Sequence, residues 1–479
     1  MHLLQIWDKK DLSLIVIYKT MNKEIISTNP AKGYEEVGRV NMSTEEEVRL
    51  AVKKAHKAFP EWKNLSVSER GGYFEKLAVL LEKNTEEIAL MQTREMGKPI
   101  RNSRGEVSGR ASYIRHNIEL AEKMLKPDVV DENDTQTTTV YFEPFGVVAA
   151  ISPWNYPTAT LFISITQALL AGNTVVAKSS EECPLTSQLI IKLFEEAGFP
   201  EGVMQMVYGD GSVGELLTDQ DVNLIHFTGS SRVGKMLYEK AAKKFISVVL
   251  EMGGSSPGIV FDNIDIKTAC PIVAHERFNN CGQICCALKR LFVQKDIMNE
   301  VTEDIVNSVK NMVVGQSEDE KTTMGPLVAK RQLDLLEEQV KDAVAKGAKV
   351  LIGGKKPEGL EGAYYEPTVL VDVTKNMRVY TEEVFGPVLP IIAFETEEEA
   401  IELANDTPYG LSAFVYTNDK DQAMRIAKEI VAGNISINGA DYFTENAPFG
   451  GHKESGMGSA EGKYGFHQVT KMKTVSEMK

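Results

Sequence analysis

The sequence predicts an α/β protein with two parallel-sheet domains and a small additional β element. Between Gly146 and Val260, short apolar runs such as "GVVAAIS", "NTVVAKS" and "NLIHFTG" alternate with helical patterns, and a second series extends from about Cys270 to Ile437. Such alternation is typical of consecutive βαβ units around a parallel sheet. The Thr-rich segment Asp128–Pro144 alternates instead and indicates a strand that touches solvent. The tail "VTKMKTV" alternates too, and we expect it to pair with that strand, within the chain or on a neighbouring subunit.

The part of the chain that precedes the first alternating series is predicted to be helical from about Glu45 to Glu119. A capping signal, "STEE" from Ser43, marks its start. The first twenty residues contain one apolar run, Leu14 to Tyr18, which is shorter than the ~7–15 residues of a secretory core. We therefore expect no signal peptide. No stretch approaches the ~20 apolar residues that span a bilayer, so no membrane association is expected.

Composition restricts the partners and the compartment. The 479 residues carry a formal net charge of -15, which argues against nucleic acid because phosphate binding needs clustered Lys and Arg. Five cysteines in a chain of this length form no regular disulfide framework. A reducing, cytoplasmic location is therefore predicted.

Two glycine-rich loops follow predicted strands. "GDGSVG" (Gly209–Gly214) matches G-x-G-x-x-G, but no acidic residue follows it by about 20 positions, as a dinucleotide fingerprint requires. "FTGSSRVG" (Phe227–Gly234) is more informative, because backbone N–H groups at a helix that starts near Ser231 could bind a pyrophosphate. An ordinary glycine turn is the alternative. Lys178 and Glu181, in "AKSSE" at the end of the neighbouring strand, could then bind the ribose hydroxyls.

The stretch "FNNCGQICCA" contains Cys281, Cys285 and Cys286. Zinc is disfavoured because zinc ligands usually come as spaced pairs, and a bridge between adjacent cysteines is strained. A nucleophile remains, against the alternative of small buried apolar side chains. A nucleophile that attacks a carbonyl needs an oxyanion donor and, for hydrolysis, a base. Asn155 in "SPWNYP" and Glu251 in "LEMGGSSP" offer these groups just beyond predicted strands.

Seven motifs in this order make the chain resemble the aldehyde dehydrogenase superfamily from about Asn29 onward: "PWNYP", "FTGSSRVG", "LEMGGSSP", "FNNCGQIC", "EEVFGPV", "NDTPYGLSAFVYT" and "PFGGHKESGMG". The resemblance implies an aldehyde dehydrogenase-like fold with a Rossmann-type cofactor domain (21–122 and 145–252), an α/β catalytic domain (253–447) and oligomerisation strands (123–144 and 464–479). It also implies a homodimer or homotetramer.

The same resemblance assigns roles to individual residues. Cys285 would be the nucleophile, Asn155 an oxyanion amide and Glu251 the activator of water, while Cys281 and Cys286 would take no part. No metal is required. The cofactor would be NAD, with NADP admitted, and the residues implied in its binding are Trp154, Lys178, Glu181, Gly211, Gly229, Ser230, Gly234, Glu383 and Phe385.

The expected reaction is oxidation of a small-molecule aldehyde to a carboxylic acid through a thiohemiacetal and a thioester. "CALKR" after the nucleophile resembles a semialdehyde-oxidising branch, which points to a substrate such as succinate semialdehyde. The two arginines typical of succinate-semialdehyde dehydrogenases are replaced by Ile163 and Asn279, which leaves Arg277 as a remote alternative cation. The other hypotheses are a CoA-acylating dehydrogenase, which the retained Glu251 disfavours, and a non-catalytic binding or structural protein on the same fold.

Overall fold

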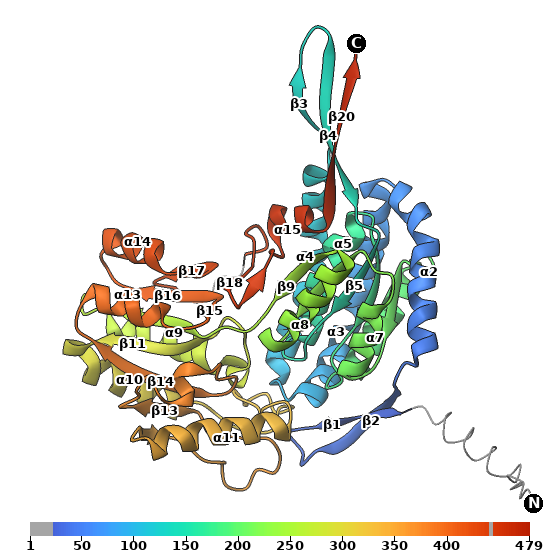
Figure 1. Ribbon diagram of the computed structural model, residues 1–479. Helices are drawn as coiled ribbons and strands as arrows, with labels where there is room; N and C mark the ends of the chain where they lie inside the picture. The colour runs from blue at the N-terminus through green and yellow to red at the C-terminus, as the bar shows by residue number, and fades with distance from the viewer. Residues whose placement is uncertain (1–22, 440–443) are drawn as a thin grey trace, which may run out of the picture.

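The computed structural model describes residues 23–439 and 444–479, so the predictions for the first twenty residues lie outside the described part. A hairpin and three helices open the chain (Figure 1): β1 (Glu24–Asn29), β2 (Glu35–Asn41), α2 (Glu45–Asn64), α3 (Val67–Met96) and α4 (Ile100–Met124). Thr44 and Ser66 each form a capping box with the Glu three residues on, which fixes where α2 and α3 begin. The predicted helical segment is confirmed.

The first sheet has six strands in the order β19-β9-β8-β5-β6-β7 and is parallel except for β19. Its strands are β5 (Val147–Ile151), β6 (Thr174–Lys178), β7 (Met204–Val207), β8 (Leu224–Thr228), β9 (Ser247–Glu251) and β19 (Gly456–Met457). The connecting helices are α5 (Pro157–Leu170), α6 (Pro184–Glu196), α7 (Gly211–Asp219) and α8 (Ser231–Lys244). Successive residues of β5 face opposite layers: Val148 packs with α5 and α6, and Ala149 with α2, α7 and α8.

The second sheet has seven strands in the order β12-β13-β14-β11-β10-β16-β17. They are β10 (Ser256–Val260), β11 (Leu288–Gln294), β12 (Lys349–Ile352), β13 (Thr368–Val371), β14 (Val388–Phe394), β16 (Ser412–Tyr416) and β17 (Asn434–Ile437). Its helices are α9 (Ile266–Phe278), α10 (Met298–Lys310), α11 (Lys330–Ala345), α12 (Arg378–Thr381), α13 (Glu397–Asn405) and α14 (Lys420–Glu429), with 3₁₀ turns η1 (Asn279–Gly282) and η2 (Lys295–Ile297). The first apolar series was predicted to extend to Val260, but β10 pairs with β11 and β16 and therefore belongs to the second sheet.

A three-stranded antiparallel sheet projects from the body of the molecule (Figure 1). It consists of β3 (Asp128–Glu132), β4 (Gln136–Pro144) and β20 (Thr470–Met478), with β4 in the middle. The pairing of the tail with the Thr-rich strand is confirmed, and it occurs within one chain, from Thr470 opposite Pro144 to Met478 opposite Gln136. The remaining elements are β15 (Tyr409–Gly410), which pairs with β18 (His452–Lys453), and α15 (Gly462–Gln468).

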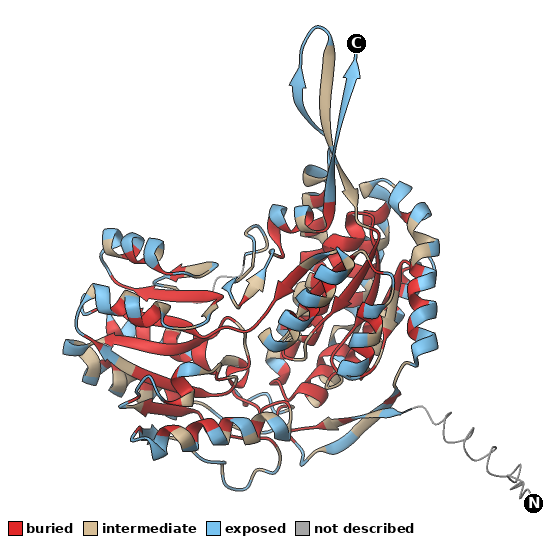
Figure 2. Cartoon of the chain, in the orientation of Figure 1, coloured by how far each residue is buried: buried red, intermediate tan, exposed pale blue. Residues whose placement is uncertain are grey.

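Burial follows the two parallel sheets. Figure 2 shows their strands as mostly buried, whereas the projecting sheet is intermediate or exposed. Val130 and Met472 of the projecting sheet are 55% and 77% exposed. Of the helices that the structure describes, none is both long and apolar enough to cross a bilayer.

Two helices of the first sheet start without a side-chain cap of their own. α5 and α6 begin at Pro157 and Pro184, and their N-cap residues make no side-chain hydrogen bond. A buried carboxylate from another helix replaces the cap of α6: Glu95 of α3 accepts from the backbone N–H groups of Leu185 (2.9 Å) and Thr186 (2.7 Å). Burial raises the pKa of Glu95 to about 7, although these hydrogen bonds by themselves lower it.

Glu95 should therefore make the stability of the protein depend on pH. Its folded pKa of about 7 exceeds the ordinary value of 4.5, so between these values the folded state binds more protons than the unfolded state. The free energy of unfolding of the wild type, relative to Glu95→Gln, should fall by up to about 3 kcal/mol as the pH rises through this range. Urea unfolding of both proteins from pH 4.5 to 8 measures the difference.

Glu87→Gln, at an exposed position of the same helix, is the matched control and should parallel the wild type. A constant difference between the wild type and Glu95→Gln at every pH would contradict this account of Glu95.

Candidate active site

Cys285 follows a strained turn at the entry to β11. Asn280, Cys281 and Gly282 have φ values of 51°, 57° and 70°, a left-handed region that non-glycine residues rarely adopt. At Gly282 a Cβ would lie 2.4 Å from the Gly386 carbonyl oxygen, so only glycine fits there. Cys281 and Cys286 are buried, whereas Cys285 is partly exposed. Of the three neighbouring thiols, that of Cys285 is the one accessible to a substrate.

Asn155 lies just beyond β5 and is tied to this turn. Its Nδ2 donates to the carbonyl of Gln283 (3.0 Å), and its own carbonyl accepts from the side-chain amide of Asn280 (3.0 Å). Gln283 is itself fixed, because its Oε1 accepts from the backbone N–H of Val328 (2.9 Å). An amide carries two N–H groups, so the second N–H of Asn155 can serve an oxyanion.

Glu251 is the last residue of β9 and is 4% exposed. Neither of its carboxylate oxygens has a hydrogen-bond partner within residues 23–439 and 444–479. Burial raises the pKa of Glu251 well above its ordinary value, and the proximity of Cys285 raises it further. The amide of Ala460 lies close enough to oppose this rise in pKa, but it donates its hydrogen to the Phe449 carbonyl (2.8 Å). Glu251 is therefore a buried carboxyl group beside the thiol, without a donor that fixes its charge.

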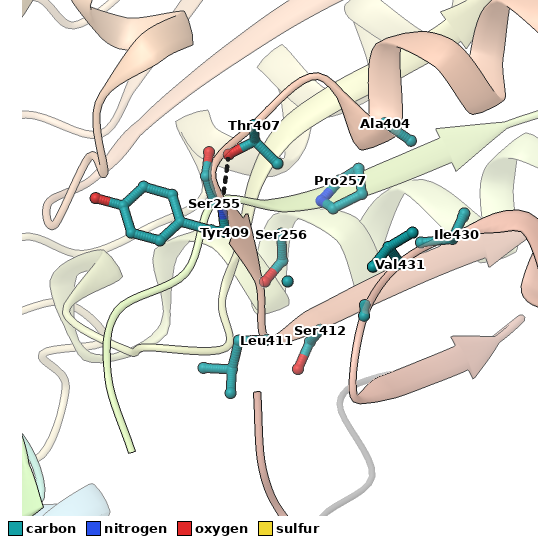
Figure 3. Close-up of a pocket in the computed structure, with 12 residues that line it drawn as sticks. Ser255, Ser256, Pro257, Ala404, Thr407, Tyr409, Leu411, Ser412, Ile430 and Val431 are labelled. Atoms are coloured by element: carbon teal, nitrogen blue, oxygen red, sulfur yellow. Dashed lines mark hydrogen bonds between the residues drawn. The ribbon is translucent and has the colours of Figure 1, made fainter. Parts of the chain in front are cut away.

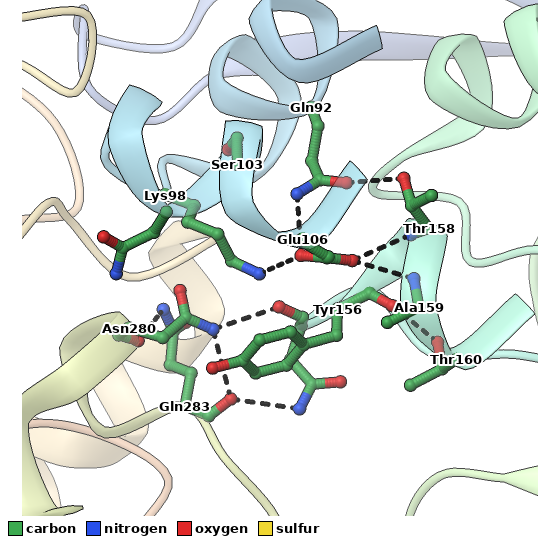
Figure 4. Close-up of polar contacts among 12 residues, drawn as sticks. Gln92, Lys98, Ser103, Glu106, Tyr156, Thr158, Ala159, Thr160, Asn280 and Gln283 are labelled. Carbon is green, nitrogen blue, oxygen red and sulfur yellow. Dashed lines mark hydrogen bonds and ion pairs between the residues drawn. The ribbon is translucent and has the colours of Figure 1, made fainter. Parts of the chain in front are cut away.

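A buried carboxylate on α4 anchors the helix that follows Asn155. Glu106 accepts from the backbone N–H groups of Thr158 (3.1 Å) and Ala159 (2.9 Å) at the start of α5, as Figure 4 shows. Its second oxygen accepts from Gln92 (2.7 Å) and pairs with the buried ammonium of Lys98, which lies 3.5 Å from the centre of the Tyr156 ring. The sequence did not predict this cluster, because the sequence pattern of an amphipathic helix does not show which of its polar side chains are buried.

Several of the residues predicted to bind the cofactor lie at or just beyond the carboxyl ends of β6, β7 and β8. Lys178 is the last residue of β6, and its Nζ lies 3.5 Å from Glu181. Burial lowers the pKa of Lys178. Ser230 caps α8, and its Oγ accepts from the Val233 N–H (3.4 Å). The strand order changes direction between β5 and β8, which is where open α/β sheets bind ligands.

The glycines of these loops differ in what surrounds them. A Cβ at Gly211 would meet nothing within 4 Å, so the start of α7 borders open space that a ligand can fill. At Gly229 a Cβ would lie 2.4 Å from the Phe227 ring, and at Gly234 it would lie 2.0 Å from the Met252 sulfur. These two glycines are required by packing.

Trp154, Glu383 and Phe385 form a second group of predicted cofactor residues, outside the loops of the first sheet that follow β6, β7 and β8. The rings of Trp154 and Phe385 pack edge to face, with centroids 5.5 Å apart. Glu383 accepts from the Gly254 N–H (3.0 Å) and pairs with the ammonium of Lys289, which the sequence analysis did not single out. The residues present suit a nicotinamide dinucleotide: the polar pair Lys178 and Glu181, the start of α8 at Ser230, and the Glu383 carboxylate, which is linked to the Cys285 backbone through Lys289.

Among the described residues, neither Ile163 nor Asn279 is replaced by a neighbouring cation that could clamp a substrate carboxylate: Arg277, the alternative, is engaged elsewhere. Ile163 packs against the core of the first domain, and Asn279 accepts from the amide of Asn102 (3.0 Å). Arg277 was the remote alternative, but it is fully buried and donates to the carbonyls of Val388 (2.8 Å), Val384 (3.0 Å) and Gly386. Burial lowers the pKa of Arg277 to about 9. Arg277 therefore holds the loop before β14 and cannot reach a substrate.

Two cavities lie away from these residues. A cavity of about 10 Å³, drawn in Figure 3, lies beside Ser255, Ser256 and Ser412 and has room for about one water molecule. A groove of about 510 Å³ lies between α10 and the strands β12 and β13. Neither contains a predicted site residue.

Comparison with known proteins agrees with this geometry. Residues 17–475 match the model of the aldehyde dehydrogenase family. Mitochondrial succinate-semialdehyde dehydrogenase of Arabidopsis thaliana is 39% identical over 456 residues, which cover 95% of this chain and 86% of that protein. Glutarate-semialdehyde dehydrogenase of Pseudomonas putida is 37% identical over 448 residues, with coverage of 93% and 92%. A structure of betaine aldehyde dehydrogenase from Staphylococcus aureus with NAD⁺ has a TM-score of 0.91 at 33% identity, with coverage of 95% and 91%.

Proposed function

The chain belongs to the aldehyde dehydrogenase family, and from this premise we propose that its site oxidises a small semialdehyde, such as succinate semialdehyde, to the carboxylic acid. The observation that carries the proposal is the grouping of three residues from separate segments. The Asn155 amide is bound to the carbonyl two residues before Cys285. The buried Glu251, whose carboxylate has no hydrogen-bond partner among the described residues, lies close enough to Cys285 for the thiol to affect its pKa.

Cys285 is the proposed nucleophile. Its thiolate attacks the aldehyde carbon and forms a thiohemiacetal, whose oxyanion accepts hydrogen bonds from Asn155 Nδ2 and the Cys285 backbone N–H. The nicotinamide, when bound, supplies the acceptor for the hydride that leaves this carbon. A thioester on Cys285 remains.

Glu251 is the proposed base for the second half-reaction. Deprotonated, it takes a proton from water, and the resulting hydroxide attacks the thioester to release the carboxylic acid. Its raised pKa brings it closer to the pH at which a general base is most effective. A CoA-acylating reaction would need no such base, so the retained carboxylate favours hydrolysis.

We attribute the preference for NAD over NADP to Glu181. A carboxylate can accept a hydrogen bond from a ribose hydroxyl but repels a 2′-phosphate, so we propose NAD as the preferred cofactor. Lys178, 3.5 Å away, offsets part of that repulsion and admits NADP. Trp154, Gly211, Ser230, Glu383 and Phe385 complete the proposed binding site, and Gly229 and Gly234 shape it through packing.

The proposed assembly is a homodimer or homotetramer. The projecting strands expose apolar side chains such as Val130 and Met472, which a second copy of the chain can cover. The proposed domains are 21–122 with 145–252 for the cofactor, 253–447 for catalysis, and 123–144 with 464–479 for association.

Cys285→Ala should lower the rate of aldehyde-dependent NADH formation by at least about a thousandfold, because no thioester can form. Cys281→Ala and Cys286→Ala, at buried neighbouring positions, are the matched controls and should retain most of the activity. The assay is absorbance of NADH with a panel of aldehydes and both cofactors. An equal loss in all three variants would refute Cys285 as the nucleophile.

Glu251→Gln should separate the two half-reactions, since hydride transfer precedes hydrolysis of the thioester. Stopped-flow measurement should show a burst of about one NADH per site followed by slow turnover. The wild-type rate should rise with pH as Glu251 loses its proton, and the variant should lack this rise. A variant without a burst that keeps the wild-type pH profile would exclude Glu251 as the base.

Ile163→Arg should lower KM for succinate semialdehyde by about ten- to a hundredfold, because an arginine adds a charge-assisted hydrogen bond to the distal carboxylate. KM for butyraldehyde, a neutral aldehyde of similar size, should not fall. Ile163→Met is the uncharged control. Wild-type protein that already saturates with micromolar succinate semialdehyde, but not with butyraldehyde, would reveal a cation other than Arg277 near the substrate.

A further inference from the structure

Lys289 is a buried cation at the centre of the candidate site. It lies on β11, four residues after Cys285, and is 1% exposed. An ammonium group has three N–H donors. The ammonium of Lys289 has three acceptors: the carbonyl of Gly254 (2.7 Å), the carbonyl of Cys285 (3.0 Å) and a carboxylate oxygen of Glu383. It is therefore fully satisfied and paired, which buried charges require.

The three acceptors belong to three separate segments of the chain. One is the backbone of the proposed nucleophile itself. Gly254 lies three residues after Glu251, the proposed base, and its N–H donates to the same Glu383 oxygen (3.0 Å). Glu383 lies just beyond α12, on the side proposed for the nicotinamide ribose. One ammonium group thus joins the nucleophile, the loop after the base and the cofactor carboxylate.

The same cation faces an aromatic side chain that leads to the oxyanion amide. Lys289 Nζ lies 5.1 Å from the centre of the Phe385 ring, within the range of a cation–π contact. Phe385 packs edge to face on Trp154, whose neighbour in the chain is Asn155. Hence the segments that contain Cys285, Gly254, Glu383 and Trp154 all border on Lys289 or on the ring beside it.

We propose that Lys289 is a positioning residue that holds the Glu383 carboxylate and the Cys285 backbone at a fixed distance from each other. The nicotinamide bound by Glu383 then lies next to the substrate bound to Cys285. The inference rests on the proposed function, in which Glu383 binds the nicotinamide ribose. Lys289 itself contacts neither substrate nor cofactor in this proposal. Without its ammonium, Glu383 would be a partly buried carboxylate held, among the described residues, by the Gly254 N–H alone.

The adjacent residue provides a contrast. Arg290 is equally buried, but its guanidinium donates to the backbone carbonyls of Ser255, Leu403, Ala404 and Asp406. Arg290 therefore ties together segments of the second domain, whereas Lys289 pairs with a carboxylate of the proposed cofactor site. The two neighbours allow a general effect of losing a buried cation to be separated from an effect on the cofactor.

The test measures the dissociation constant of NADH by fluorescence titration of the full chain without aldehyde, beside kcat and KM for NAD. Lys289→Met should weaken NADH binding by about ten- to a hundredfold, the range for loss of a charge-assisted hydrogen bond. Glu383→Gln should weaken it similarly. In the double variant the losses should not multiply, because both substitutions break the same link. Arg290→Met, which removes the buried cation at the adjacent position, should keep the wild-type NADH affinity.

The double variant also guards against misfolding, since it removes both members of the buried pair and leaves no unpaired charge. If Lys289→Met cannot be purified, the comparison of Glu383→Gln with the double variant decides the question in the same way. Wild-type NADH affinity in Lys289→Met, with only a lower melting temperature, would overturn the inference and leave Lys289 a structural cation. Multiplying losses would overturn it too. A wild-type protein that binds no NADH and reduces no NAD with any aldehyde would instead refute the proposed function, and with it this inference.

Discussion

The arrangement of the candidate site depends on one buried carboxylate, that of Glu106 on α4, which binds the start of α5. Proline at the first position of this helix and the absence of a cap at Tyr156 leave backbone N–H groups that need an acceptor. Glu106 supplies it from α4, and the paired Lys98 compensates its charge. Because Asn155 immediately precedes this helix, the same contact fixes the amide that reaches across to the Gln283 carbonyl of the other domain.

The buried charged residues around Cys285 differ in whether they have hydrogen-bond and charge partners. Glu106 and Lys289 are satisfied by several partners, which makes them rigid supports. Glu251 has no hydrogen-bond partner among the described residues, and burial raises its pKa. A paired charge resists changes of protonation, whereas burial without a charge partner raises the pKa of a carboxyl group and so favours its protonated form. The first arrangement suits positioning and the second suits proton transfer.

Backbone geometry adds a further constraint at the turn before Cys285. Asn280 and Cys281 adopt left-handed backbone conformations, which the surrounding structure must impose. The hydrogen bonds of Asn280 with Asn155 and Gln283 do so. Gly282 approaches the Gly386 carbonyl more closely than any side chain allows. Thus the turn that presents Cys285 is held by residues of both domains, and its geometry requires that the domains be packed together.

The sequence by itself determined the α/β class, most strands of both sheets, the pairing of the tail with the Thr-rich strand and the family, because hydrophobic periodicity and local motifs are written in neighbouring residues. It also singled out Cys285, Asn155 and Glu251 as a group. Only the tertiary structure decided that Arg277 donates to backbone carbonyls, that Glu106 accepts from the first N–H groups of α5, and that Lys289 pairs with Glu383 beside the Cys285 backbone. These facts depend on contacts between residues far apart in the chain, and a lysine or glutamate carries no local signal of whether it will be buried and paired or exposed to water.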